Sequence, residues 1–212
     1  MQIFPRELNN LPLALAVVAG GLGAGVFLLF WVYFTPPNLQ VGYTPKQPVD
    51  YSHRLHADEL GLDCRYCHSQ VERSHEAMVP PTQTCMGCHA VVHTESEKLA
   101  LVRESWESDE SLAWIRVHQV PDHVFFDHSA HLRAGVGCVS CHGRVDQMET
   151  VGVVEPLAMQ WCLECHRDPE EQIRPKSEVT NMDWEADEAW IAQRALVADV
   201  LNPPTHCSGC HR

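Results

Sequence analysis

The sequence predicts a mostly α-helical protein with extensive irregular structure, in which an N-terminal transmembrane helix precedes a body organised around one repeated motif. Three observations predict this class. A run of 24 residues without a charge lies near the N-terminus, the motif Cys-x-x-Cys-His occurs five times, and little of the remaining chain has the apolar periodicity of long helices or strands.

The uncharged run extends from Leu11 to Phe34 and is long enough to cross a bilayer as a helix, which Pro36-Pro37 is expected to end. A cleaved signal peptide is the alternative. The run exceeds a signal h-region, however, and no small-x-small cleavage site follows it. We therefore expect an uncleaved single-pass anchor. Gly21 and Gly25 have the small-xxx-small spacing that lets another membrane helix approach, although glycine is also common in such helices.

All ten cysteines belong to the five motifs: Cys64, Cys67 and His68; Cys85, Cys88 and His89; Cys138, Cys141 and His142; Cys162, Cys165 and His166; Cys207, Cys210 and His211. This motif is the attachment signature of c-type haem, in which both thiols bond the porphyrin and the adjacent histidine becomes the proximal iron ligand. Disulfides, zinc sites and redox cysteine pairs are the alternatives, but none of them requires a histidine at the same position five times. We expect five covalent haems.

The motifs lie in an internal repeat. "YSHRLHADELGLDCRYCH" from Tyr51 matches "FDHSAHLRAGVGCVSCH" from Phe126, and a second motif follows each of these segments. Each half is therefore expected to be a dihaem module. The fifth motif stands alone near residue 207.

Five proximal histidines leave five sixth positions to fill, and nine of the 14 histidines lie outside the motifs. The two His-x-x-His pairs should leave the same side of a short helix, and His118 is the fifth choice, ahead of His123. The predicted distal ligands are therefore His53, His56, His118, His128 and His131. Met148 and Met159 are alternative sixth ligands, although methionine more often serves packing.

Regular structure is otherwise sparse. We expect helices from Glu95 to Val117 and from 183 to 201, and porphyrins in place of much of the side-chain core. The predicted organisation is a cytoplasmic N-terminus and anchor (1–35), a first dihaem module (36–94), a linker helix (95–122), a second dihaem module (123–170), and a C-terminal helix with the fifth haem site (171–212).

The formal net charge of −13 argues against a nucleic-acid partner, which would repel the chain, and favours docking to a basic patch on an electron-transfer protein. Covalent c-type haem is installed outside the bacterial cytoplasm. The body is therefore expected in the periplasm, held at the inner membrane by the anchor.

In these motifs and their surroundings, the chain resembles the pentahaem cytochrome c subunit of bacterial alternative complex III. The resemblance covers nearly the whole chain and includes "PPTQTCMGCH", "WIRVHQVPDHVFFDHSAHLRAGVGCVSCHGRVDQM", "MQWCLECHR" and "CSGCHR". The His-x-x-His modules are similar to the wider class III multihaem cytochromes. The resemblance implies an iron–sulfur subunit related to molybdopterin oxidoreductases, polytopic quinol-binding membrane subunits, and a monohaem cytochrome c or terminal oxidase as partners.

We therefore expect a non-catalytic electron-transfer subunit of a quinol-oxidising complex, with low-spin haems. Two alternatives stay open. One is a multihaem reductase with an open haem iron. The other is the multihaem subunit of a related quinone-reductase complex, in which electrons run the opposite way.

Overall fold

The computed structural model describes residues 5–34 and 41–211. The chain divides into two compact units, residues 1–37 and 38–212, and each is described by itself.

The N-terminal unit contains a short 3-10 helix η1 (Arg6–Asn10) and the long helix α1 (Leu11–Phe34). The bounds of α1 coincide with those predicted from the uncharged run. Its described apolar side chains are exposed along its length, for example Val17 at 66% and Phe27 at 63%. One helix in the described residues is long and apolar enough to span a membrane, a property that a signal sequence shares. The predicted end at Pro36-Pro37 lies outside the described residues.

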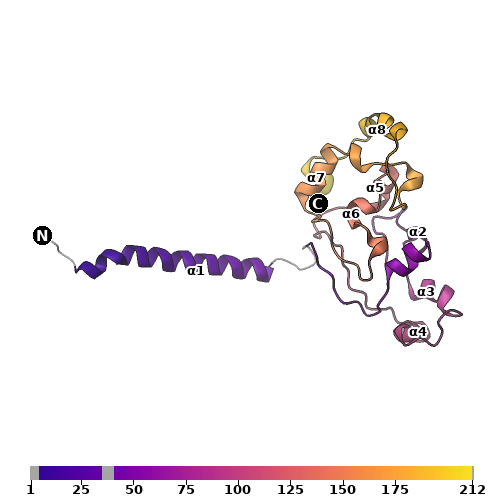
Figure 1. Ribbon diagram of the computed structural model, residues 1–212, viewed down its shortest axis with the longest axis horizontal. Helices are drawn as coiled ribbons and strands as arrows, with labels where there is room; N and C mark the ends of the chain where they lie inside the picture. The colour runs from indigo at the N-terminus through magenta and orange to yellow at the C-terminus, as the bar shows by residue number, and fades with distance from the viewer. Residues whose placement is uncertain (1–4, 35–40, 212) are drawn as a thin grey trace. The chain divides into compact units, whose positions relative to one another are not determined.

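The second unit, which we call the body, is built from short helices joined by irregular segments (Figure 1). Its α-helices are α2 (Cys64–Cys67), α3 (Thr82–His89), α4 (Ala100–Ser108), α5 (His128–Ala134), α6 (Val139–His142), α7 (Met159–Arg167), α8 (Glu188–Val200) and α9 (Cys207–Cys210). Short η helices occupy Arg54–Glu59 (η3), Glu97–Leu99 (η4), Val145–Gln147 (η5), Glu170–Gln172 (η6) and Lys176–Glu178 (η7). Strand pairing in the described part of the body is confined to two isolated antiparallel bridges, Val124 with His211 and Val136 with Ile173. The prediction of a helical, irregular body is confirmed.

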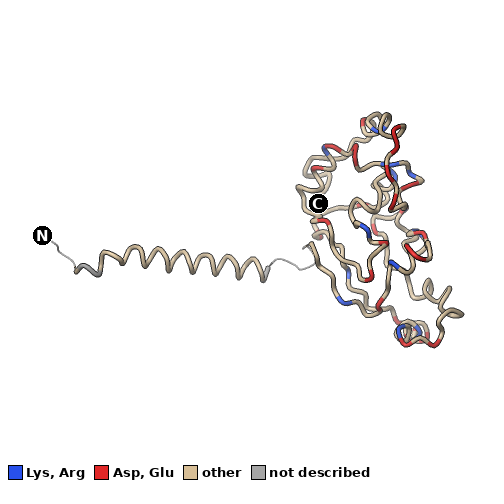
Figure 2. The backbone as a smooth tube through the Cα atoms, viewed as in Figure 1, with Lys and Arg blue, Asp and Glu red and all other residues tan. Residues whose placement is uncertain are grey.

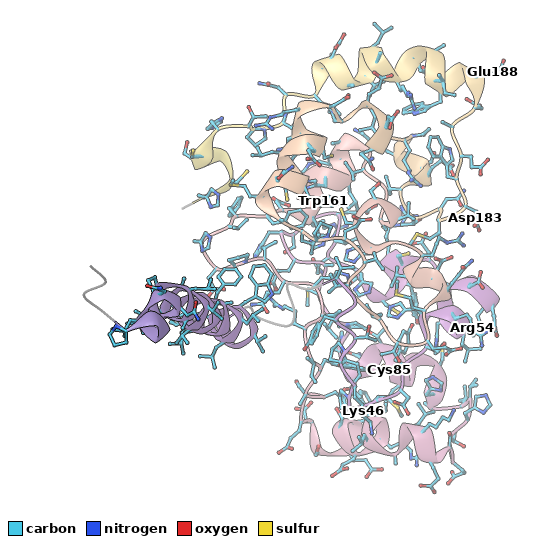
Figure 3. The ribbon with its side chains drawn as sticks, turned by 60° about the vertical axis from the view of Figure 1, so that its left-hand side comes forward. Lys46, Arg54, Cys85, Trp161, Asp183 and Glu188 are labelled. Atoms are coloured by element: carbon cyan, nitrogen blue, oxygen red, sulfur yellow. The ribbon has the colours of Figure 1, made fainter. Side chains whose placement is uncertain are left out.

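The second motifs of the two predicted modules lie toward opposite ends of the body. Figure 1 shows α3 and α4 toward one end, α7 and α8 toward the other, and α5 and α6 between them. The labelled side chains of Cys85, on α3, and Trp161, on α7, lie well apart in Figure 3. The second motif of each module therefore lies away from the centre, where the first motifs meet.

The predicted helix from Glu95 to Val117 is wrong in its extent. A 3-10 turn leads into α4, which ends at Ser108, and Asp109 adopts a left-handed conformation with φ 59°. Beyond it the chain is held by Gln47, whose side chain pairs with both the N–H and the carbonyl of Ile115 at 2.9 Å. Tertiary hydrogen bonds thus override helix propensity there. The second predicted helix, 183–201, is shorter as well, because Asp187 caps α8 by accepting the Trp190 N–H at 2.7 Å.

The two His-x-x-His segments form related but unequal helices. The second is the regular helix α5, capped by Asp127 and ended by Gly135 at φ 89°. The first, η3, is a π-helix that begins after His53. In both, an aromatic residue precedes the pair and lies against both imidazoles. Ring centres of Tyr51 are 4.9 Å from His53 and 4.5 Å from His56. The corresponding distances from Phe126 are 4.8 Å to His128 and 4.6 Å to His131.

The side-chain core of the body is small. Among the described residues, seven hydrophobic side chains are buried: Val49, Val71, Val102, Val117, Val153, Ile173 and Val179. A body of this length normally buries a far larger apolar core. Exposed ion pairs across the body, such as Arg54 with Glu149 at 2.7 Å, add little stability. Charged residues of both signs are spread along it in Figure 2.

Candidate haem sites

Each Cys-x-x-Cys-His motif forms about one helical turn. The N–H of the motif histidine donates to the carbonyl of the first cysteine in three of them, at 2.9 Å in His68, 3.0 Å in His142 and 2.8 Å in His211. The other two motifs end α3 and lie within α7. Residues three apart on such a turn share one side, so each pair of thiols is presented together. All ten cysteines are free thiols, so every pair is available for attachment.

The turn of the first motif is fixed by Asp63. Its carboxylate accepts the Arg65 N–H and two guanidinium hydrogen bonds at 2.8 Å each, and it accepts the Thr180 hydroxyl at 3.0 Å. The Arg65 side chain is the main cause that lowers the pKa of Asp63 to about 2. Thr180 belongs to the C-terminal part of the chain, so this contact also ties that part to the first motif.

Hydrogen bonds orient many of the histidines in the same way. Among the described residues, six donate Nδ1–H to a backbone carbonyl oxygen at 2.6 to 3.0 Å: His56 to Ser52, His68 to Met78, His89 to Val92, His128 to His75, His131 to Asp127, and His166 to Pro204. A carbonyl can only accept, so the proton lies on Nδ1 and the lone pair on Nε2. This is the support that metal-ligating imidazoles usually have.

Motif histidines face histidines from outside the motifs. The ring centres of His56 and His89 are 6.3 Å apart, and those of His131 and His166 are 6.0 Å apart. Metal–imidazole bonds of about 2 Å on each side would place the centres of two opposed imidazoles about 6 Å apart. The second histidine of each His-x-x-His pair therefore lies at the spacing of a sixth ligand for the second motif of its own module.

The first motifs share a cluster of imidazoles at the centre of the body. His142 lies 4.4 Å from His118 and 6.4 Å from His128, ring centre to ring centre. Burial lowers the pKa of His142 to about 3 and that of His53 to about 4, with neighbouring histidines adding to the effect, His68 among them in both cases. These rings are neutral at neutral pH, as iron ligation requires.

Two buried nitrogens in this cluster have no hydrogen-bond partner, Nδ1 of His53 and Nε2 of His118. Buried polar atoms are almost always paired, and an unpaired imidazole nitrogen is suited to a metal. The donor set of the body therefore fits c-type haem.

A cavity of about 220 Å³ adjoins one of the ring pairs. His131 and His166 line it together with Cys165, and its other walls include the apolar side chains of Val136, Ile173 and Leu201. An apolar space bordered by two opposed imidazoles and an attachment cysteine suits one face of a porphyrin.

A protein-only metal site fits less well. Within residues 5–34 and 41–211, no group of three or more His, Cys, Asp or Glu side chains converges as a metal site would need. Structural zinc usually takes four protein ligands, whereas haem iron needs only two from the protein.

Of the predicted distal ligands, His56, His118, His128 and His131 lie beside motif histidines, but in the described residues none of the predicted set is paired with His211, and the two methionines lie apart from these ring pairs. Met159 is 65% exposed at the start of α7. Met148 lies next to η5, where its carbonyl accepts the Arg54 N–H at 3.1 Å. Both stay alternative sixth ligands. In addition, the structure pairs His123 with His211 at 5.5 Å, a contact that sequence reasoning did not anticipate.

A comparison with known proteins gives one informative relative. The chain is 27% identical over 201 residues to the menaquinone reductase multihaem cytochrome c subunit of Nitratidesulfovibrio vulgaris, and the match covers 90% of this chain and 88% of that protein. No family model matches the chain.

Proposed function

We propose that the chain is a membrane-anchored multihaem c-type cytochrome that serves as the electron-transfer subunit of a quinone-linked oxidoreductase complex. The observation that carries this proposal is that a second imidazole lies about 6 Å from a motif histidine, as His56 does from His89 and His131 does from His166. The similarity to a multihaem subunit of a menaquinone reductase supports it.

The residues that would hold haem are the ten cysteines as covalent attachments, and His68, His89, His142, His166 and His211 as proximal ligands. His56 and His131 would be the distal ligands of the irons held by His89 and His166. The distal ligands of the irons held by His68 and His142 would come from the cluster of His53, His118 and His128. When bound, low-spin haem exchanges single electrons without binding substrate.

The chain's own contribution is to place the attachment sites in a row. Tyr66 of the first motif lies beside Gly87 of the second, where an added Cβ would be 3.6 Å from the tyrosine oxygen. The thiol of Cys64 interacts with that of Cys138, and with burial this raises the pKa of Cys138.

The row continues from the third motif. Burial, followed by the nearby thiols of Cys165 and Cys162, raises the pKa of Cys141 to about 12, so the third and fourth motifs are neighbours. The hydrogen bond from His166 to Pro204, 2.7 Å long, joins the fourth motif to the segment before the fifth. The attachment sites therefore follow the order second, first, third, fourth, fifth.

This row gives the body two ends, at the second and fifth motifs, where partners would deliver and receive electrons. The anionic body would dock with a basic partner surface, and α1 would hold it at the periplasmic face of the inner membrane. As in alternative complex III, quinol oxidation would occur in partner subunits, with this chain carrying the electrons outward.

Menaquinone reduction is the second candidate, and the relative's name favours it. The same row of sites would then carry electrons inward, to a quinone-binding partner.

The test uses the intact complex purified in detergent. Pyridine haemochrome analysis should find five haems per chain, and the oxidised complex should show low-spin haem by electron paramagnetic resonance (EPR). His56→Ala should convert one haem to high spin, whereas His75→Ala, at an exposed histidine whose side chain has no assigned role, should not. Fewer than five haems in the unmodified protein, or an unchanged spectrum in His56→Ala, would contradict the proposal.

The direction of transfer has its own measurement. Rapid reduction of the haems by menadiol in the complex would support quinol oxidation. Rapid oxidation of pre-reduced haems by menadione, with slow reduction by menadiol, would support quinone reduction.

A further inference from the structure

The fifth motif has a facing imidazole from a distant part of the chain. His123 precedes the second module, yet its ring centre lies 5.5 Å from that of His211, with an angle of 19° between the ring planes. The second and fourth motifs also have a histidine from outside the motifs beside the motif histidine, at 6.3 Å and 6.0 Å, although their ring planes are inclined at larger angles of 69° and 38°.

Backbone contacts hold the segment around His123 against the fifth motif. Val124 and His211 form an antiparallel bridge, and the Phe125 N–H donates to the Cys210 carbonyl. The Val124 N–H in turn donates to the Pro121 carbonyl at 2.8 Å, which turns the chain at His123. His123 is therefore held beside the motif by its neighbours on the main chain, and its side chain is free to act as a ligand.

The positions of the other histidines are consistent with His123 serving as a ligand at the fifth motif. His56 and His131 face the second and fourth motifs, while His53, His118 and His128 surround His68 and His142 at the centre of the body. In the ring contacts of the described residues, none of these five is paired with His211. Without His123, the fifth iron would depend on His206, which directly precedes Cys207 at the N-cap position of α9.

We propose that His123 is the distal iron ligand of the haem attached at Cys207 and Cys210, opposite His211. The proposal rests on the proposed function, since it requires haem at that motif. It makes the last site six-coordinate and leaves three imidazoles, those of His53, His118 and His128, for the two central irons. One of those three is then not an iron ligand.

The consequence for function lies at one end of the row. A closed fifth iron exchanges electrons with a partner and binds no small ligand, whereas an open one would bind carbon monoxide when reduced. His123 thus decides whether this end of the body is an electron port or a reaction site.

The experiment compares His123→Ala with His206→Ala in the complete complex. His206 is exposed and lies next to the same motif, so it controls for disturbance of the C-terminal segment. Both variants should retain five haems by pyridine haemochrome analysis. His123→Ala should lose the low-spin EPR signal of one haem, gain a high-spin signal, and bind one more carbon monoxide per complex than the unmodified protein when reduced.

His123→Met provides a second readout that does not depend on an open site. A thioether ligand should keep the haem low-spin, add the spectrum of methionine-ligated haem, and raise one of the five reduction potentials. This variant decides the question if His123→Ala does not accumulate.

The proposal is overturned if His123→Ala keeps all of its low-spin signal and binds no carbon monoxide, if His206→Ala gives the change instead, or if His123→Met shows only bis-histidine haem. Fewer than five haems in the unmodified protein would refute the proposed function itself, which separates the two failures.

Discussion

The glycines that precede the two first motifs offer a matched test of how the body is packed. Gly61 and Gly135 occupy the same position in the repeat, three residues before Cys64 and Cys138, and both have positive φ, 66° and 89°. Their surroundings differ. A Cβ on Gly61 would meet nothing within 4 Å, whereas one on Gly135 would overlap the carbonyl of Arg174.

Alanine should therefore have unequal effects at the two positions. The left-handed conformation costs an alanine about 1 kcal/mol at either site. At Gly135 the overlap adds about 1–3 kcal/mol, because the Arg174 N–H donates to the Gly135 carbonyl at 2.8 Å and the backbone has little room to move. The two variants should thus differ by about 2 kcal/mol, or about 4–8 °C in Tm for a body of this size.

The assay is thermal unfolding of the purified holoprotein, followed by far-UV circular dichroism and by haem absorbance. Gly135→Ala should also alter the absorbance of one haem before unfolding, since Val136 and Ile173 line the cavity beside His131. Equal Tm values for Gly61→Ala and Gly135→Ala would refute the packing of α5 against the Arg174 segment.

Other predictions concern charge, the buried arginine and the cofactor. The pKa of Asp63 is lowered from 3.8 to about 2, so its stabilising effect should be complete above pH 4 and be lost as the pH falls toward 2. Asp63→Asn should then unfold more readily than the unmodified protein at neutral pH but not near pH 2, and a constant difference in acid titrations would contradict this. Arg174→Gln removes the hydrogen bond to the Asn181 carbonyl and the contact of the guanidinium with the Trp184 ring, whose centre is 5.0 Å away. This should lower the free energy of unfolding by about 2 kcal/mol, measured by thermal unfolding. An unchanged Tm would contradict the prediction. Protein made without haem attachment should lack near-UV circular dichroism from the body, and a native-like spectrum would show that side chains suffice as its core.

The sequence predicted the local features well. Cysteine spacing located five motifs, and the structure has a helical turn at each of them, because each motif is contained within a few residues. The bounds of α1 followed from the absence of charge, and the His-x-x-His pairs were recognised because two helical positions three apart must share a side. These features need no knowledge of distant contacts.

Features that depend on distant contacts were missed. The helix predicted up to Val117 stops at Ser108, because Gln47 binds the backbone at Ile115. The contact of His123 with His211 was not predicted, because only the backbone bridge between Val124 and His211 brings His123 to the fifth motif. One local signal was available in the sequence, because His123 lies between Pro121 and the aromatic pair Phe125-Phe126, and residues of these types restrict how a histidine can move.

The small side-chain core has a consequence for biogenesis. With seven buried hydrophobic side chains in the described residues, the body has little to hold it together before its porphyrins are in place. If haem is attached as proposed, we expect the polypeptide to reach the haem ligation machinery extended, with each thiol pair accessible in turn. Residues 124 and 211 pair only when the last motif has reached its final position, so the body should finish folding after the last haem is attached. The supply of haem in the cell would then limit how much folded protein forms.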